Sequence, residues 1–257
     1  KYADRFYKYK RDAWERQHLE YRELSPDDPN FIEEYRVLLE QSRTDIVTTL
    51  EELREIIGSG ALQDFECAHL DAYFFGQHLY QPLLHLKNTA IQISPVTLNA
   101  GERDFVVDLR KFHDQETGFF EGKELYLLRN MSRGRGIGFF EAGNFHPDFI
   151  LWLLADQKQY VSFVDPKGIR NLEGPNDPKI RFHETIKEIE ARLGDPVVIL
   201  NSFIISNTPL RQVSWWSDGM TKAEFEDRNV VFQQEDKNTY IRTILTKALA
   251  GQSAVTV

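Results

Sequence analysis

Two short apolar runs, separated by a polar turn, constrain this chain more than any other feature. Residues 149–154 read Phe-Ile-Leu-Trp-Leu-Leu, and residues 160–164 read Tyr-Val-Ser-Phe-Val. Runs this short, rich in β-branched and aromatic side chains and bounded by turn-forming residues, predict a hairpin of two buried strands. In a hairpin, the start of the first strand lies beside the end of the second. The pattern therefore predicts that Asp148, Asp165 and Lys167 lie close together.

These three side chains suit metal-dependent hydrolysis. Two carboxylates held against an apolar wall repel each other, so a hard divalent cation such as Mg²⁺ would stabilise the pair. A lysine beside them could activate a water molecule or stabilise charge on a phosphate. The alternative is structural, because Asp is common at strand starts and Asp-Pro is a common turn. The sequence thus contains a candidate metal site in which Asp148 and Asp165 are the ligands.

Composition limits the other possibilities. A chain of 257 residues that is 41% hydrophobic can bury a sizeable core, either as one domain with a helical extension or as two small domains. The single cysteine, Cys67, excludes an internal disulfide framework and a zinc site built mainly from cysteines. No apolar run approaches the roughly 20 residues that cross a membrane, so we expect a cytoplasmic location and no membrane partner. The net charge of −9 requires any DNA contact to use a local basic face.

Residues 1–90 are expected to form a helical region. A cluster of turn formers at 25–30 separates a first helical pattern from an amphipathic helix over residues 31–57, and glycines at 58 and 60 end that helix. Residues 61–90 are interpreted as mixed but mainly helical. This region could pack its own core, or it could be a connector that docks on another domain or subunit.

Residues 91–257 alternate between helical and strand patterns. The expected strands lie at 124–128, 137–141, 149–154, 160–164, 197–205 and 213–216. The expected helices lie at 101–112, 181–193 and 221–250, and Asp236 starts or interrupts a second segment of the last one. This order predicts an α/β core with a mixed central sheet flanked by helices, following the N-terminal helical region.

Several carboxylates and one histidine could complete the candidate site. Glu102 opens the helix at 101–112, where it could face the metal or simply interact with the helix dipole. Asp104 and Asp108 are alternatives on the same helix, although a solvated position suits them better. Glu141 could add a carboxylate, and His146 could touch a substrate. For His146, which lies in a turn, a solvated position is the default interpretation.

A local basic run supplies the candidate DNA contact. Arg129, Arg133 and Arg135 lie in a segment with two glycines, which allow backbone amides to approach phosphates closely. We expect these arginines to contact the DNA backbone, with an ordinary exposed turn as the alternative. A further basic group in the later helical segment could also face DNA or simply be solvated: Lys179, Arg181 and Lys187. Gly-Arg-Gly-Ile-Gly lacks the Gly-Lys-Ser/Thr ending of a P-loop, so no ATP hydrolysis is expected.

Pro147-Asp148 followed by Asp165-Pro166-Lys167 at the end of a strand resembles the PD-(D/E)xK nuclease superfamily. Asn99-Ala100-Gly101-Glu102 and a strand ending in Arg129-Asn130 extend the likeness over roughly residues 78–216. This stretch is similar to the C-terminal endonuclease domain of type III restriction-enzyme subunits and related helicase-nuclease proteins. The resemblance implies a restriction-endonuclease-like core within 91–257.

The resemblance also implies an activity and its residues. It implies hydrolysis of phosphodiester bonds in double-stranded DNA with Mg²⁺, for which Mn²⁺ could substitute. Asp148, Asp165 and the backbone carbonyl of Pro166 would hold the metal, and Glu102 would complete its shell or orient a water molecule. Lys167 would activate the nucleophile or stabilise the transition state.

The family also has characteristic partners. The resemblance implies an ATP-dependent helicase domain elsewhere, a methyltransferase subunit, and a restriction or phage-defence role in a prokaryotic cytoplasm. Two other functions stay open from the sequence. One is a catalytically inactive interaction domain that kept the nuclease fold, which the acidic net charge favours. The other, weaker alternative is a metal-dependent phosphatase.

Overall fold

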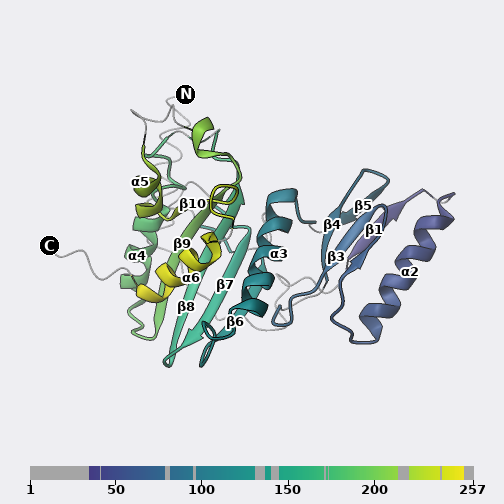
Figure 1. Cartoon of the computed structure of the whole chain (residues 1–257), viewed down its shortest axis with the longest axis horizontal. Coiled ribbons are helices and arrows are strands. Elements are labelled where there is room, and N and C mark those ends of the chain that lie inside the picture. The colour runs from purple at the N-terminus through teal and green to yellow at the C-terminus, as the bar shows by residue number, and fades with distance from the viewer. Residues whose placement is uncertain are drawn as a thin grey trace.

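A mixed sheet of five strands organises the part of the chain that the structure describes (Figure 1). The structure is a computed structural model, and it describes residues 35–40, 42–78, 82–94, 97–130, 137–139, 145–170, 172, 174–213, 220–237 and 239–251. Helices flank this sheet, so the described chain is an α/β protein, as the sequence predicts.

The strands of the large sheet follow the order β10-β9-β8-β7-β6. They are β6 (Glu124–Arg129), β7 (Phe149–Ala155), β8 (Lys158–Lys167), β9 (Val198–Ser206) and β10 (Val230–Phe232). Strands β6, β7 and β8 are antiparallel neighbours, whereas β8, β9 and β10 are parallel. The predicted hairpin is confirmed as β7 and β8. Its turn is tighter than expected, because Asp156 and Gln157 both adopt positive φ angles, of 51° and 61°, as a type I′ turn requires.

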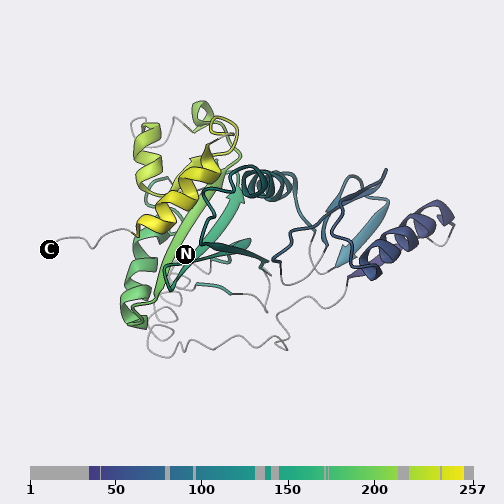
Figure 2. The same cartoon turned by 60° about the horizontal axis from the view of Figure 1, so that its bottom comes forward.

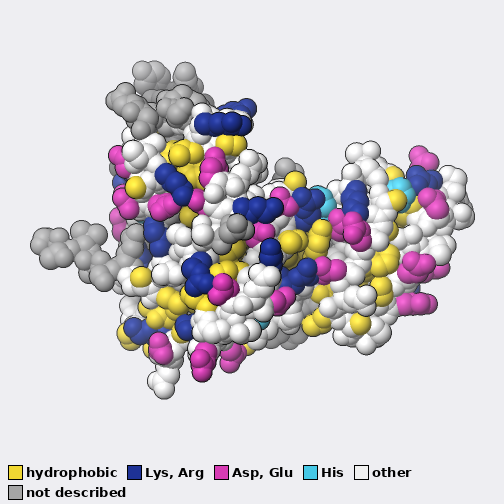
Figure 3. Space-filling model, in the orientation of Figure 1, with side chains coloured by type: hydrophobic (Ala, Val, Ile, Leu, Met, Phe, Trp, Pro, Cys, Tyr) yellow, Lys and Arg dark blue, Asp and Glu magenta, His cyan; other side chains and the backbone are white. Residues whose placement is uncertain are grey.

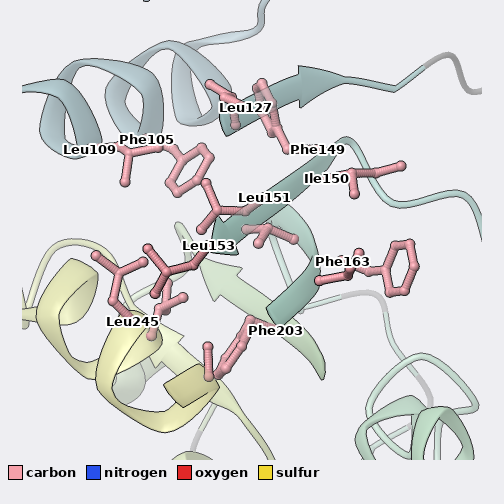
Figure 4. Close-up of a cluster of buried hydrophobic side chains, with 14 of the residues drawn as sticks. Phe105, Leu109, Leu127, Phe149, Ile150, Leu151, Leu153, Phe163, Phe203 and Leu245 are labelled. Carbon is pink, nitrogen blue, oxygen red and sulfur yellow. The ribbon is translucent and has the colours of Figure 1, made fainter. Parts of the chain in front are cut away.

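Helices cover both faces of the large sheet (Figure 2). They are α3 (Ala100–Gln115), α4 (Phe182–Leu193), α5 (Lys222–Asp227) and α6 (Tyr240–Ala250), and a short 3₁₀ helix, η2, spans Leu210–Gln212. Helices α3 and α4 confirm two of the predicted helices. Leu151 points toward Phe105 of α3 and Leu153 toward Leu245 of α6, whereas Ile150 and Phe163 point to the opposite side of the sheet (Figure 4). Burial of each such side chain stabilises the folded state by about 1.5–3 kcal/mol. The ends of β7 and β8 are therefore anchored in a well-packed core.

The N-terminal part of the structure contains more strands than predicted. Its elements are β1 (Arg36–Leu39), α2 (Thr44–Gly58), β2 (Phe65–Glu66), β3 (Leu70–Tyr73), β4 (Leu83–Leu86) and β5 (Ile91–Ser94). Residues 1–34 lie outside the described residues. Within the described part, the predicted helical region is wrong for 61–90, which holds three antiparallel strands. The runs are only two to four residues long, and runs that short do not distinguish a helical period from a strand period.

The small sheets and α2 form a separate lobe on the far side of α3 from the large sheet (Figure 1). Strand β5 pairs with β1, so residues on both sides of position 90 belong to this lobe. Its apolar core includes Ile46, Leu53 and Leu70.

A second correction concerns the C-terminal part. Residues 221–250 are not continuously helical, because β10 separates α5 from α6 and pairs in parallel with β9. Asn229, at a φ of 56°, follows α5 and redirects the chain into this strand. The predicted edge strand at 213–216 is not tested, because 214–216 lie outside the described residues. No described helix is long and apolar enough to cross a bilayer.

Candidate metal-dependent active site

The candidate site lies where β7 begins and β8 ends. Phe149 of β7 pairs with Val164 of β8, so Asp148, one residue earlier, faces Asp165, one residue later. The two carboxyl groups lie within hydrogen-bonding reach of each other, and the Nζ atom of Lys167 contacts Oδ2 of Asp165. The structure therefore confirms that these three side chains converge, as the hairpin pattern predicts.

Burial and charge give Asp165 unusual electrostatics. Its side chain is only 4% exposed, compared with 18% for Asp148 and 19% for Lys167. Burial raises the pKa of Asp165 from an ordinary 3.8 to about 7, the charge of Lys167 opposes this rise, and the nearby Asp148 carboxylate adds to it. A buried carboxyl group near a second carboxylate holds either a proton or a cation at neutral pH.

The donor atoms fit a hard divalent cation. Apart from Lys167, no described residue donates a hydrogen bond to the buried Oδ2 of Asp165. Carboxylate oxygens are the ligands that Mg²⁺ prefers, and this ion is usually held by one or two carboxylates together with water. Among the described residues, no group of three or more His, Cys, Asp or Glu side chains could hold a metal. A cation at this site would therefore be held by Asp148 and Asp165. The backbone carbonyl of Pro166, the residue that follows Asp165 on β8, stays a predicted ligand.

Glu102 is linked to the site through Arg129. Oε2 of Glu102 accepts a hydrogen bond of 2.9 Å from the backbone nitrogen of Asn99, and Oδ1 of Asn99 accepts one of 3.0 Å from the backbone nitrogen of Glu102, which forms a capping box at the start of α3. Oε1 of Glu102 lies 3.1 Å from Nη2 of Arg129. Glu102 is therefore both a helix-capping residue and a partner of the site, and its role as a metal ligand stays a prediction.

The prediction that Arg129 contacts DNA is wrong. Its side chain is only 4% exposed and lies between Glu102 and Asp148, with Nη1 at 3.3 Å from Oδ1 of Asp148 and at 2.5 Å from the Asp148 carbonyl oxygen. The guanidinium also lies 4.9 Å from the ring centroid of Phe149. Arg129 therefore orients Asp148 from inside the protein. Arg133 and Arg135, the other two predicted DNA contacts, lie outside the described residues, as does Glu141.

The remaining carboxylate and histidine candidates have other contacts. Asp104 pairs with Arg103 at 2.6 Å, and Asp108 accepts a hydrogen bond of 2.8 Å from the hydroxyl of Tyr240. His146 packs its ring against the backbone of Gly138, so closely that a Cβ atom at position 138 would clash with the ring. The structure therefore provides no contact between these residues and the Asp148–Asp165 pair.

Asn130 positions Asp148, a role that sequence reasoning missed. Its backbone nitrogen donates to the carbonyl of Asp148 at 2.8 Å, and its Nδ2 donates to the carbonyls of Pro147 and Ile137, each at 2.8 Å. Its Oδ1 accepts from the backbone nitrogen of Ile137 at 2.9 Å. The buried amide therefore ties the segment before β7 to the end of β6. The sequence signal was the asparagine directly after the first core strand.

Replacing Asn130 with alanine should loosen this segment. We expect Asn130→Ala to lower the free energy of unfolding by about 1–3 kcal/mol, because buried carbonyl and amide groups lose their partners. Urea unfolding of both proteins measures this change. Asn88→Ala is the control, because Asn88 is exposed on the N-terminal lobe, where its side chain bonds the partly buried His69 side chain and the Ala68 carbonyl. An equal effect of both substitutions would contradict the role of Asn130.

The raised pKa of Asp165 predicts a specific pH dependence of stability. The folded state binds this proton more tightly than the unfolded state, so the contribution of Asp165 to the free energy of unfolding is largest below pH 4 and is lost as the pH rises toward about 7. Asp165→Asn is uncharged at every pH. We therefore expect the variant to gain stability relative to the wild type between pH 4 and 7 in metal-free buffer, as followed by urea unfolding at each pH. A difference that does not change with pH would show that the Asp165 pKa is ordinary.

The chain matches no protein-family model, no curated protein and no solved structure.

Proposed function

We propose that this chain is a Mg²⁺-dependent endodeoxyribonuclease domain with a restriction-endonuclease-like core. The observation that carries the proposal is the convergence of Asp148, Asp165 and Lys167 at the adjacent ends of β7 and β8. The sheet supports it further, because an antiparallel hairpin continues into parallel strands and α3 packs against β8.

Each residue has a distinct role in the proposed hydrolysis. Asp148 and Asp165 hold the cation, which when bound would lower the pKa of a water ligand and offset charge on the scissile phosphate. The Asp165 carboxyl must be ionised to bind it, and Lys167 favours that ionised form. The Lys167 ammonium then stabilises negative charge that develops on the phosphate. The buried Arg129, which pairs with Glu102, holds Asp148 in position.

The surface charge restricts any DNA contact to a local area of the protein. On the face shown in Figure 3, basic and acidic side chains are interspersed, and no broad basic patch covers that view. With a net charge of −9, the chain would bind DNA weakly by itself. A DNA-bound partner would overcome this weakness. We therefore include in the proposal an ATP-dependent helicase domain, a methyltransferase subunit and a prokaryotic restriction or phage-defence setting, with the chain in the cytoplasm.

Cleavage of supercoiled plasmid tests the proposal. We expect the purified chain to convert supercoiled DNA to nicked or linear forms with Mg²⁺ or Mn²⁺, and to leave it intact in EDTA. Gel electrophoresis measures the conversion. Hydrolysis of small phosphate esters without plasmid cleavage would instead favour a metal-dependent phosphatase.

A catalytically inactive interaction domain is the second candidate. Arg129 and Lys167 already neutralise Asp148 and Asp165 in this structure, which would suit a site that works without metal. The same plasmid assay separates the two functions, because an inactive domain would leave DNA intact at every Mg²⁺ and Mn²⁺ concentration, including when a helicase partner is present.

A further inference from the structure

Lys179 brings a second ammonium group to the candidate site. Its Nζ atom lies 5.7 Å from the ring centroid of Phe145, and the Nζ atom of Lys167 lies 5.2 Å from the same centroid. Phe145 is buried, and its ring contacts Phe182 at the start of α4 with a centroid separation of 5.4 Å. The ring is therefore a fixed platform that attracts both cations.

The backbone of Lys179 is held in place as well. Its amide donates a hydrogen bond of 2.9 Å to Oδ1 of Asp177, a buried residue. The amide of Asp177 in turn donates to the carbonyl of Gly174 at 3.0 Å. Lys179 is thus presented by an ordered turn, while its side chain is only partly buried and remains open to a ligand.

Among the described residues, the two ammonium groups share one ion-paired carboxylate, that of Asp165. The pKa of Lys179 is lowered, first by burial and then by the positive charge of Lys167, while Asp165 and Asp177 oppose this shift. Lys167 uses Asp165 as its counter-ion, and Lys179 forms no ion pair with a carboxylate of the described chain. A bound anion would therefore offset the positive charge that Lys179 adds beside Lys167.

The other basic residues of this segment differ from Lys179. Arg181, which precedes α4, pairs with Glu184 in its first turn at 3.1 Å. Lys187 pairs with Glu190 within α4 at 2.9 Å. These pairs neutralise their charges locally. Lys179 is therefore the member of this basic group that the fold directs toward the candidate site.

We propose that Lys167 and Lys179 together hold one phosphodiester group of the DNA backbone. A phosphodiester carries one negative charge spread over two non-bridging oxygens, and lysine ammonium groups bind phosphate as point charges. Two ammonium groups above one ring, beside a metal-binding carboxylate, match such an anion. This inference rests on the proposed nuclease function and adds Lys179 as a phosphate-binding residue.

The salt dependence of DNA binding tests the proposal. Binding of a short fluorescent duplex, followed by anisotropy in EDTA over a salt series, needs no hydrolysis. The slope of log Kobs against log salt concentration is negative, and we expect Lys179→Gln to reduce its magnitude by about 0.9, the value for one lost phosphate contact. Lys179→Arg keeps the charge and should keep the slope. Lys187→Gln is the matched control and should also keep it.

The outcomes separate this inference from the nuclease proposal. If the wild type cleaves plasmid with Mg²⁺ and the folded Lys179→Gln variant binds with an unchanged slope and affinity, the lysine pair does not hold a phosphate. If Lys179→Gln reduces the magnitude of the slope but the wild type cleaves no DNA, the phosphate site stands and the nuclease function is wrong. A wild type that binds no duplex even at low salt would contradict both.

Discussion

Asp165→Asn should abolish metal-dependent DNA cleavage without weakening the fold. We expect the rate of plasmid nicking to fall by about a thousandfold or more, because the variant loses a charged metal ligand that is worth several kcal/mol in the transition state. The free energy of unfolding at pH 7 should stay equal to that of the wild type or rise. Burial disfavours the charged form of Asp165, as its raised pKa shows, and a neutral amide avoids that cost.

Activity and stability, measured together, distinguish a functional role of Asp165 from a packing role. A residue needed only for packing would lose stability and activity together, whereas a buried ligand kept for function loses activity alone. Asp195→Asn is the matched control, because Asp195 lies in an exposed turn after α4 and should leave both properties unchanged. An Asp165→Asn variant that nicks plasmid at the wild-type rate would overturn the assignment of this residue.

Arg129→Met should cause the largest loss of stability among the substitutions considered. Arg129 lies between Glu102 and Asp148, and the side chains of Arg129 and Glu102 are almost fully buried. Its removal leaves the buried Glu102 without its ion-pair partner, and breaking a buried pair in this way costs about 3–5 kcal/mol. Urea unfolding measures the change in the free energy of unfolding. Plasmid nicking should also fall, because Asp148 loses the group that orients it.

Two further variants isolate the cause of this loss. Arg181→Met removes an exposed arginine that pairs with Glu184, and it should cost no more than about 1 kcal/mol. Adding Glu102→Gln to Arg129→Met should restore part of the stability, because it removes the carboxylate that was left unpaired. A loss of less than about 1 kcal/mol in Arg129→Met would show that the buried network is not stabilising.

Local patterns predicted the site well. The apolar runs of β7 and β8 are long enough to read as strands, and a tight turn joins them, so the meeting of Asp148 with Asp165 follows from the hairpin alone. The start of α3 was equally predictable, because Asn99 and Glu102 form a capping box three residues apart.

Contacts between distant segments could not be predicted in the same way. The burial of Arg129 depends on the pairing of β6 with β7 and on α3 bringing Glu102 over the sheet. A run of arginines and glycines in sequence gives no sign of this, and it suggested a DNA contact instead. Strand β10 has only three residues, and its partner β9 lies far back in the chain, so its apolar residues fitted a helical pattern equally well. The prediction for residues 61–90 was wrong for the same reason, because strands β2, β3 and β4 are also short.

The position of the bound cation tests most directly the claim that Asp148 and Asp165 share one ion. Fe²⁺ can replace Mg²⁺ at oxygen-rich sites, and with ascorbate and peroxide it cleaves the polypeptide near where it binds. Mass spectrometry then locates the cuts. We expect cuts within residues 145–150 and 163–168 that excess Mg²⁺ suppresses and that Asp165→Asn removes. Cuts confined to other parts of the chain, or cuts that persist unchanged in Asp165→Asn, would contradict a metal site at the ends of β7 and β8.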